Sequence, residues 1–92
     1  MLGRRSVRRR PTAFRSVTGG VVIASQRTGD ALFLPATAAA VWDLIEDRAD
    51  EDAIALSLQA QFPDVDPTEI RRSVTAILGV LDDEGLLEGD PT

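Results

Sequence analysis

The chain has 92 residues, of which 43% are hydrophobic, and a formal net charge of −5 at pH 7. It contains neither Cys nor His, and all ten of its basic residues are Arg. This inventory excludes disulfides, thiolate or imidazole catalysis, imidazole metal ligands and Schiff-base chemistry. We therefore expect one small non-catalytic domain without a metal site or a cofactor. No apolar run reaches the length of a secretory or membrane-spanning segment, so we expect a cytoplasmic protein without membrane contact.

The basic residues are concentrated at the N-terminus. Half of them lie in the first ten residues: Arg4, Arg5, Arg8, Arg9 and Arg10. The rest of the chain holds five Arg against fifteen acidic residues, a net charge of −10. Because residues 1–11 have no periodic apolar face, we expect a disordered basic arm there. Such an arm either keeps the protein soluble or contacts phosphate or anionic lipid.

Three strands are predicted after the arm. Residues 12–17 alternate weakly, and residues 21–25 form a β-branched run of strand length. Gly29 supplies a turn signal before a third apolar run, residues 31–34. The short connections predict a three-stranded antiparallel sheet, which needs a cover on one face.

Three helices are predicted to supply that cover. The first begins between Pro35 and Thr37, with Pro at the first helical position and Thr37 as the capping residue, and ends near residues 46–48. Asp50 can cap the second helix. Asp66, Pro67 and Glu69 have the spacing of a strong start for the third. Gly85 ends it as a left-handed residue, with Leu86 folded back. The fold class is α+β, a sheet followed by three helices in a winged helix-turn-helix-like order.

The third helix carries charges that its own electrostatics do not explain. Arg71 and Arg72 lie near its positive end, and three acidic residues crowd its negative end, Asp82 to Glu84. Each group is either a solvated surface or a recognition element beside a groove. A DNA-binding winged helix is the alternative function, and it would depend on the Arg-rich arm, because the acidic body is repelled by phosphate.

An ordered set of segments carries a family resemblance. The segments are Gly20-Val21-Val22-Ile23, Thr28-Gly29, Leu34 to Ile45 with Thr37 and Trp42, Phe62 to Asp66, and Val74, Leu78, Leu81 and Gly85-Leu86-Leu87. Over residues 13–88 the chain resembles the PqqD-like family of recognition elements for ribosomally made, post-translationally modified peptides, and most resembles freestanding lasso-peptide B1 proteins. It departs from the family at Pro35, where an Asn commonly caps the first helix. The resemblance implies a peptide-binding domain over residues 12–88 and a flexible tail over 89–92.

The resemblance also implies a function. The leader segment of a precursor peptide, here of a lasso peptide, would bind as an added antiparallel strand between the third strand and the third helix. The domain would then deliver the precursor to a separate leader peptidase of the B2 type and to the cyclase. We expect a monomer, while a dimer formed through the same strand edge is a further alternative.

The implied site combines the strand edge with one flank of the third helix. Leu32 and Leu34 share one face of the strand, and Ala31 and Phe33 share the other, but the pattern does not assign the two pairs to core and groove. On the helix, a 100° step places Ile70, Val74, Ile77 and Leu81 near the core. The same step places Arg71, Thr75, Leu78 and Asp82 along one flank, which is the predicted groove wall. Leu78 either contributes to that wall or widens the core stripe. The peptide-binding residues expected are Asp30, Ala31, Leu32, Phe33, Leu34, Arg71, Val74, Thr75, Leu78 and Asp82.

Overall fold

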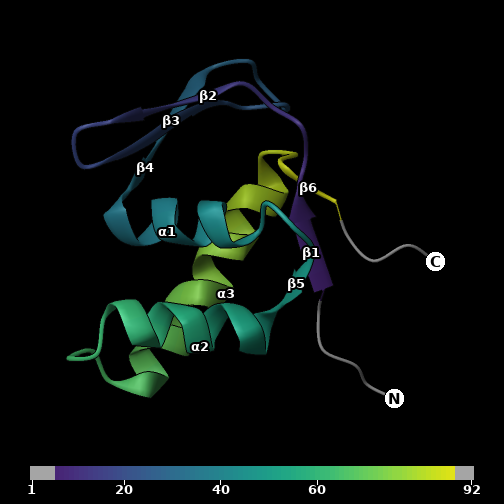
Figure 1. The fold of residues 1–92 in the computed structure, drawn as a ribbon. Helices are drawn as coiled ribbons and strands as arrows, with labels where there is room; N and C mark the ends of the chain where they lie inside the picture. The colour runs from purple at the N-terminus through teal and green to yellow at the C-terminus, as the bar shows by residue number, and fades with distance from the viewer. Residues whose placement is uncertain (1–5, 89–92) are drawn as a thin grey trace.

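The structure, a computed structural model, describes residues 6–88. A three-stranded sheet lies above three helices, and a second small sheet lies at their side (Figure 1). Helix α1 runs beneath the larger sheet, with α3 behind it and α2 farthest from the sheet. The elements in chain order are β1 (Ser6–Arg9), β2 (Phe14–Val17), β3 (Gly20–Ala24), β4 (Ala31–Pro35), α1 (Ala36–Leu44), β5 (Ala49–Asp50), α2 (Glu51–Gln61), α3 (Pro67–Asp83) and β6 (Leu87–Glu88).

The larger sheet has the strand order β2-β3-β4 and is antiparallel throughout. Its register pairs Val21 with Leu34 and Ile23 with Leu32, so these four side chains share one face. That face covers the helices, because Val21, Ile23 and Leu34 are buried. The predicted α+β fold, a three-stranded antiparallel sheet with three helices, is confirmed.

Two of the predicted helix caps are confirmed. The Asp50 carboxylate accepts a hydrogen bond from Ala53 N at 2.8 Å, and that of Asp66 accepts one from Thr68 N at 2.8 Å. Gly85 ends α3 with φ +75°, a left-handed conformation that glycine adopts without strain. Leu86 N donates to Leu81 O and Gly85 N to Asp82 O, which is the Schellman arrangement.

The prediction for the start and end of α1 was wrong. Pro35 occupies the N-cap position with extended backbone, and no side chain caps the helix. Thr37 lies inside the first turn, so it cannot serve as the capping residue. The helix ends at Leu44, because Ile45 has left the helical conformation and Ala49–Asp50 must reach β1.

The predicted disorder of residues 1–11 was also wrong for the part that the structure describes. Ser6–Arg9 form β1, which pairs with β5 on one side and with β6 on the other. Val7 is fully buried in the core. Residues 1–5, and the tail predicted at 89–92, lie outside the described residues.

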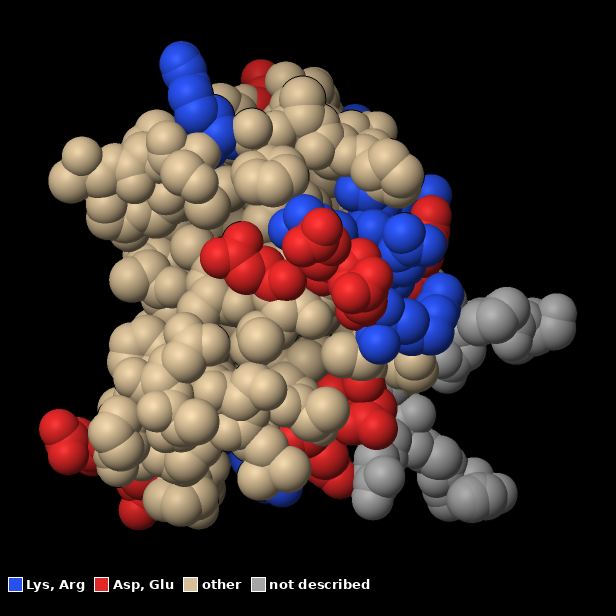
Figure 2. Space-filling model, in the orientation of Figure 1, with Lys and Arg blue, Asp and Glu red and all other residues tan. Residues whose placement is uncertain are grey.

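Arginine side chains attach β1 to the helices. The Arg9 guanidinium lies 4.8 Å from the ring centroid of Phe14 and 5.1 Å from that of Trp42, and donates to Trp42 O at 3.1 Å. Arg8 donates to Glu46 O, and Arg10 donates to Leu87 O. In Figure 2, basic and acidic side chains lie against one another on the side where Figure 1 places β1. Cation–π contacts and carbonyl acceptors therefore occupy arginines that the sequence presents as a charged arm.

Trp42 is the largest fully buried side chain. Its ring meets Phe14 edge to face at a centroid distance of 5.8 Å. The core around it is formed by Val7, Val21, Ile23, Leu34, Ala38, Val41, Ile45, Ile54, Ala55, Leu58, Ile70, Val74, Leu78, Leu81, Leu86 and Leu87. One contiguous core thus joins both sheets to all three helices.

Candidate functional site

The outer edge of β4 is open. β4 pairs with β3 alone among the described strands. Ser25 N donates to Asp30 O at 2.8 Å, so these two residues form a hydrogen-bonded pair. Hydrogen-bonded and non-hydrogen-bonded pairs alternate from there along β3 and β4. Leu32 and Leu34 then direct their backbone groups to β3, and Ala31 and Phe33 direct theirs outward. The edge therefore offers an N–H and a C=O group at two alternate residues to an added strand.

The same alternation explains why proline is tolerated at position 35. Pro35 faces Gly20 in a pair that exchanges no hydrogen bonds with β3, so the missing N–H removes nothing from the ladder. Proline also cannot donate outward, so it ends the run of edge donors just before α1. Gly20 is required opposite it, because an added Cβ would collide with Leu34 O.

An apolar groove runs between this edge and α3. On the strand side Leu32 is half-buried and Leu34 is buried, while Phe33 is 52% exposed. Hence Leu32 and Leu34 form the pair that faces the helices, which the sequence left open, and Phe33 flanks the groove from the outer face. The lining residues are Leu32, Phe33, Leu34, Pro35, Ala38, Ala76, Ile77 and Val80.

The predicted flank of α3 does not lie beside β4. Arg71 pairs with Asp52 at 2.7 Å and Thr75 donates to Glu51 at 3.3 Å, so this flank faces α2. Val74 and Leu78 are buried in the core. Asp82 continues the same flank by helical spacing, seven residues beyond Thr75.

The wall that faces β4 is instead formed by Ala76, Ile77 and Val80. Val80 is 47% exposed, and Ile77 is only half-buried rather than near the core centre. The available signal was the apolar pair Ala76 and Val80, four residues apart outside the core stripe, which indicates a second apolar flank.

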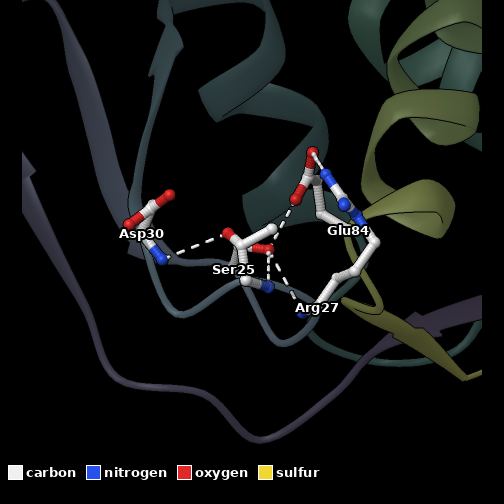
Figure 3. A network of polar contacts seen from close by, with 5 residues as sticks. Ser25, Arg27, Asp30 and Glu84 are labelled. Atoms are coloured by element: carbon white, nitrogen blue, oxygen red, sulfur yellow. Dashed lines mark hydrogen bonds and ion pairs between the residues drawn. The ribbon is translucent and has the colours of Figure 1, made fainter.

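A polar network holds the β3–β4 turn against the end of α3 (Figure 3). The buried Ser25 hydroxyl donates to the Glu84 carboxylate, Arg27 lies 3.4 Å from the other carboxylate oxygen, and Gln26 N donates to Glu84 O at 3.0 Å. The Ser25 hydrogen bond, followed by the smaller effect of Arg27, holds the pKa of Glu84 below its usual value, against partial desolvation. The network fixes the distance between β4 and α3 at one end of the groove.

Neither a metal-binding cluster nor a membrane-spanning helix is found among residues 6–88. This range contains no cluster of acidic residues arranged to hold a metal ion. Nor does any of its helices have the length and apolarity needed to cross a bilayer. Asp30, the remaining predicted site residue, is exposed just before β4, and its carboxylate points away from Glu84 in Figure 3.

The fold and groove define a class: a winged helix-turn-helix-like α+β domain with an open strand edge beside an apolar helix flank. A family model described as "Coenzyme PQQ synthesis protein D (PqqD)" matches residues 20–87. The chain therefore belongs to the PqqD family. No curated protein sequence matches it.

Three solved structures resemble the fold. TbiB1 in complex with the TbiA(beta) leader peptide has a TM-score of 0.76 at 23% identity, covering 92% of this chain and 99% of that one. A lasso peptide synthetase B1 complexed with the leader peptide has a TM-score of 0.73 at 24% identity, covering 89% and 96%. The PqqD truncation of Methylobacterium extorquens PqqCD, described as a functional stand-alone recognition element for ribosomally synthesised and post-translationally modified peptides, has a TM-score of 0.68 at 27% identity, covering 90% and 88%.

Proposed function

We propose that this protein is a non-catalytic recognition element that binds the leader segment of a ribosomally made precursor peptide, here of a lasso peptide. The observation that carries the proposal is the open edge of β4 beside an apolar groove, in a chain of the PqqD family. Two of the similar structures are complexes with leader peptides.

The peptide adds to the sheet as a fourth strand. Antiparallel addition is favoured because antiparallel pairs are the more stable arrangement. Ala31 and Phe33 exchange backbone hydrogen bonds with the peptide, and alternate peptide side chains enter the groove against Ile77 and Val80. Main-chain bonds supply affinity, and the apolar groove selects apolar side chains at every second position.

Delivery, rather than chemistry, is the role that follows. Without Cys, His or Lys the chain has only carboxylates, hydroxyls and Arg available for chemistry. We assign cleavage of the bound precursor to a separate leader peptidase of the B2 type, followed by the cyclase. We assign the protein to the cytoplasm, where ribosomal precursors are made, and expect it to act as a monomer.

The DNA-binding alternative is not favoured. It depended on the N-terminal arginines, and Arg8, Arg9 and Arg10 donate to carbonyl oxygens of the protein itself. The two structures with bound partners hold peptides.

The test is a titration with a synthetic leader peptide from the precursor encoded beside this protein, followed residue by residue by NMR. Binding at micromolar or lower Kd, with shifts over residues 31–35 and 76–80, is expected. Shifts confined to residues 6–10 would contradict the groove model. Light scattering without peptide distinguishes the monomer from a dimer formed through the β4 edge.

A further inference from the structure

The apolar wall of the groove ends in opposite charges. Arg72 precedes Ala76 by four residues on the same row of α3, and Asp83 follows Val80 by three. Both side chains are exposed, and neither has a hydrogen bond or an ion pair within residues 6–88. Arg71, the neighbour of Arg72, pairs instead with Asp52 on the other flank. The wall is therefore positive at one end, apolar in the middle and negative at the other end.

The negative end is the stronger of the two. Asp83 lies in the last turn of α3, which has no basic residue and carries the negative end of the helix dipole. Asp30 is exposed at the start of β4. Acidic residues here destabilise the helix end, and a cationic group bound beside them would relieve that cost.

α3 and β4, which form the two walls of the groove, run antiparallel to each other. Gln26 N bonds Glu84 O, so the C-terminal end of α3 lies at the Ala31 end of β4. The Arg72 end then lies toward Pro35, since Pro35 and Ala76 line the same groove. A peptide antiparallel to β4 passes Arg72 first and Asp83 last.

We infer that the groove reads the charge order of its peptide: an acidic residue, then apolar residues at alternate positions, then a basic residue. The inference rests on the proposed function and adds the direction and chemistry of the segment that is read. Arg72 binds the acidic residue, and Asp83 with Asp30 binds the basic one.

The spacing of the two charges follows from helix and strand geometry. Arg72 and Asp83 are eleven residues apart, about 16 Å along the helix axis at about 1.5 Å per residue. An extended peptide rises about 3.4 Å per residue, so about 16 Å corresponds to about five residues. Helix side chains lean toward the N-terminus, and the longer Arg72 side chain leans farther than that of Asp83, so the two charged groups lie more than about 16 Å apart. Six is the next even number, which keeps both peptide charges on the same face as the apolar side chains.

Two synthetic peptides of identical composition test the charge order. One is Ser-Glu-Thr-Val-Thr-Val-Thr-Arg-Ser, and its twin exchanges only Glu and Arg. Both are neutral overall, so the net charge of the protein does not favour either. The Glu-first peptide should bind about tenfold more tightly at low salt, because both charge pairs at the rim are attractive in this peptide and repulsive in its twin. Added salt should reduce the difference.

Charge exchange on the protein supplies the matched control. The double variant Arg72→Asp with Asp83→Arg should reverse the preference, and Arg71→Gln, on the α2 flank, should leave it unchanged. Equal affinities, a preference for the Arg-first peptide, or no binding of either peptide up to millimolar concentration would each overturn the inference. If the authentic leader still bound in the groove in those cases, the proposed function would stand without it.

Discussion

β1 and β4 are short strands of opposite character. β1 contains Arg8 and Arg9 and is followed by Arg10, yet it is closed. Strands flank it on both sides, and the three guanidinium groups donate to carbonyl oxygens. β4 is apolar, yet one of its edges is open. The concentration of charge at the N-terminus is therefore not what marks the proposed peptide site. That proposal depends on the unpaired backbone groups of β4 and on the uncovered apolar flank of α3 beside them.

The largest expected effect comes from placing one substitution in both strands. Val7→Asp buries an unpaired carboxylate in the core and should lower the free energy of unfolding by about 3–5 kcal/mol. Phe33→Asp, at a side chain 52% exposed, should change it by about 0.5 kcal/mol or less. Urea denaturation of both variants checks this contrast. Equal losses would show that β1 is not part of the core.

The next effect concerns the open edge alone. Phe33→Pro removes an outward N–H and should weaken leader binding about tenfold to a hundredfold, because a peptide carbonyl is left unpaired. Phe33→Ala is the matched control, since it removes the ring and keeps the N–H. Calorimetric titration should separate the two. If Phe33→Ala weakened binding as much as Phe33→Pro, the ring and not the edge would hold the peptide.

A smaller effect on folding stability is expected for Arg9, which attaches β1 to the core. Arg9→Ala loses the contacts to Phe14 and Trp42 and the hydrogen bond to Trp42 O, and should cost about 1–2 kcal/mol of folding stability. Arg8→Ala, at an exposed side chain, serves as the control. Trp42 is the one Trp of the chain, so its fluorescence reports the change directly. Peptide affinity should stay unchanged in both variants, and its loss in Arg9→Ala would contradict the separation of β1 from the groove.

The smallest effect is pH-dependent. Because the Ser25 hydrogen bond lowers the pKa of Glu84 below 4.5, the ionised group stabilises the fold above that pH and loses this contribution as the pH falls through the lower folded-state value. The stability difference between wild type and Ser25→Ala should therefore shrink between pH 6 and pH 3. Thr28→Ala, which loses only a bond to Asp30 N, should give a difference independent of pH. If the stability difference between wild type and Ser25→Ala were also independent of pH, the hydrogen bond from Ser25 to the ionised Glu84 would not contribute to stability.

The features that depend on residues close together in the chain could be predicted from the sequence, and those that depend on distant residues could not. The caps at Asp50 and Asp66 and the end at Gly85 are local signals, and the structure confirms them. β1 depends on contacts with Trp42 and Leu87, far away in the chain, and a single Val among arginines gives no periodicity.

The face of α3 that lies beside β4 differs from the predicted one for another reason. Ile77 and Leu78 are adjacent apolar residues, so the core stripe of α3 can be drawn through either one. The other core residues of the helix are the same in both cases, so this choice turns the stripe by much less than the roughly 100° between neighbouring residues. Periodicity alone does not tell which flank of the stripe faces β4 and which faces α2, and the pairing of Arg71 with Asp52 decides it.

Amide hydrogen exchange on the leader complex tests the central claim most directly. Binding as an added strand should protect the outward amides of Ala31 and Phe33, while Leu32 and Leu34, which already bond to β3, change little. That alternation is the signature of a strand added to the β4 edge. Protection confined to β1, or to β2 at the opposite edge of the sheet, would contradict the account.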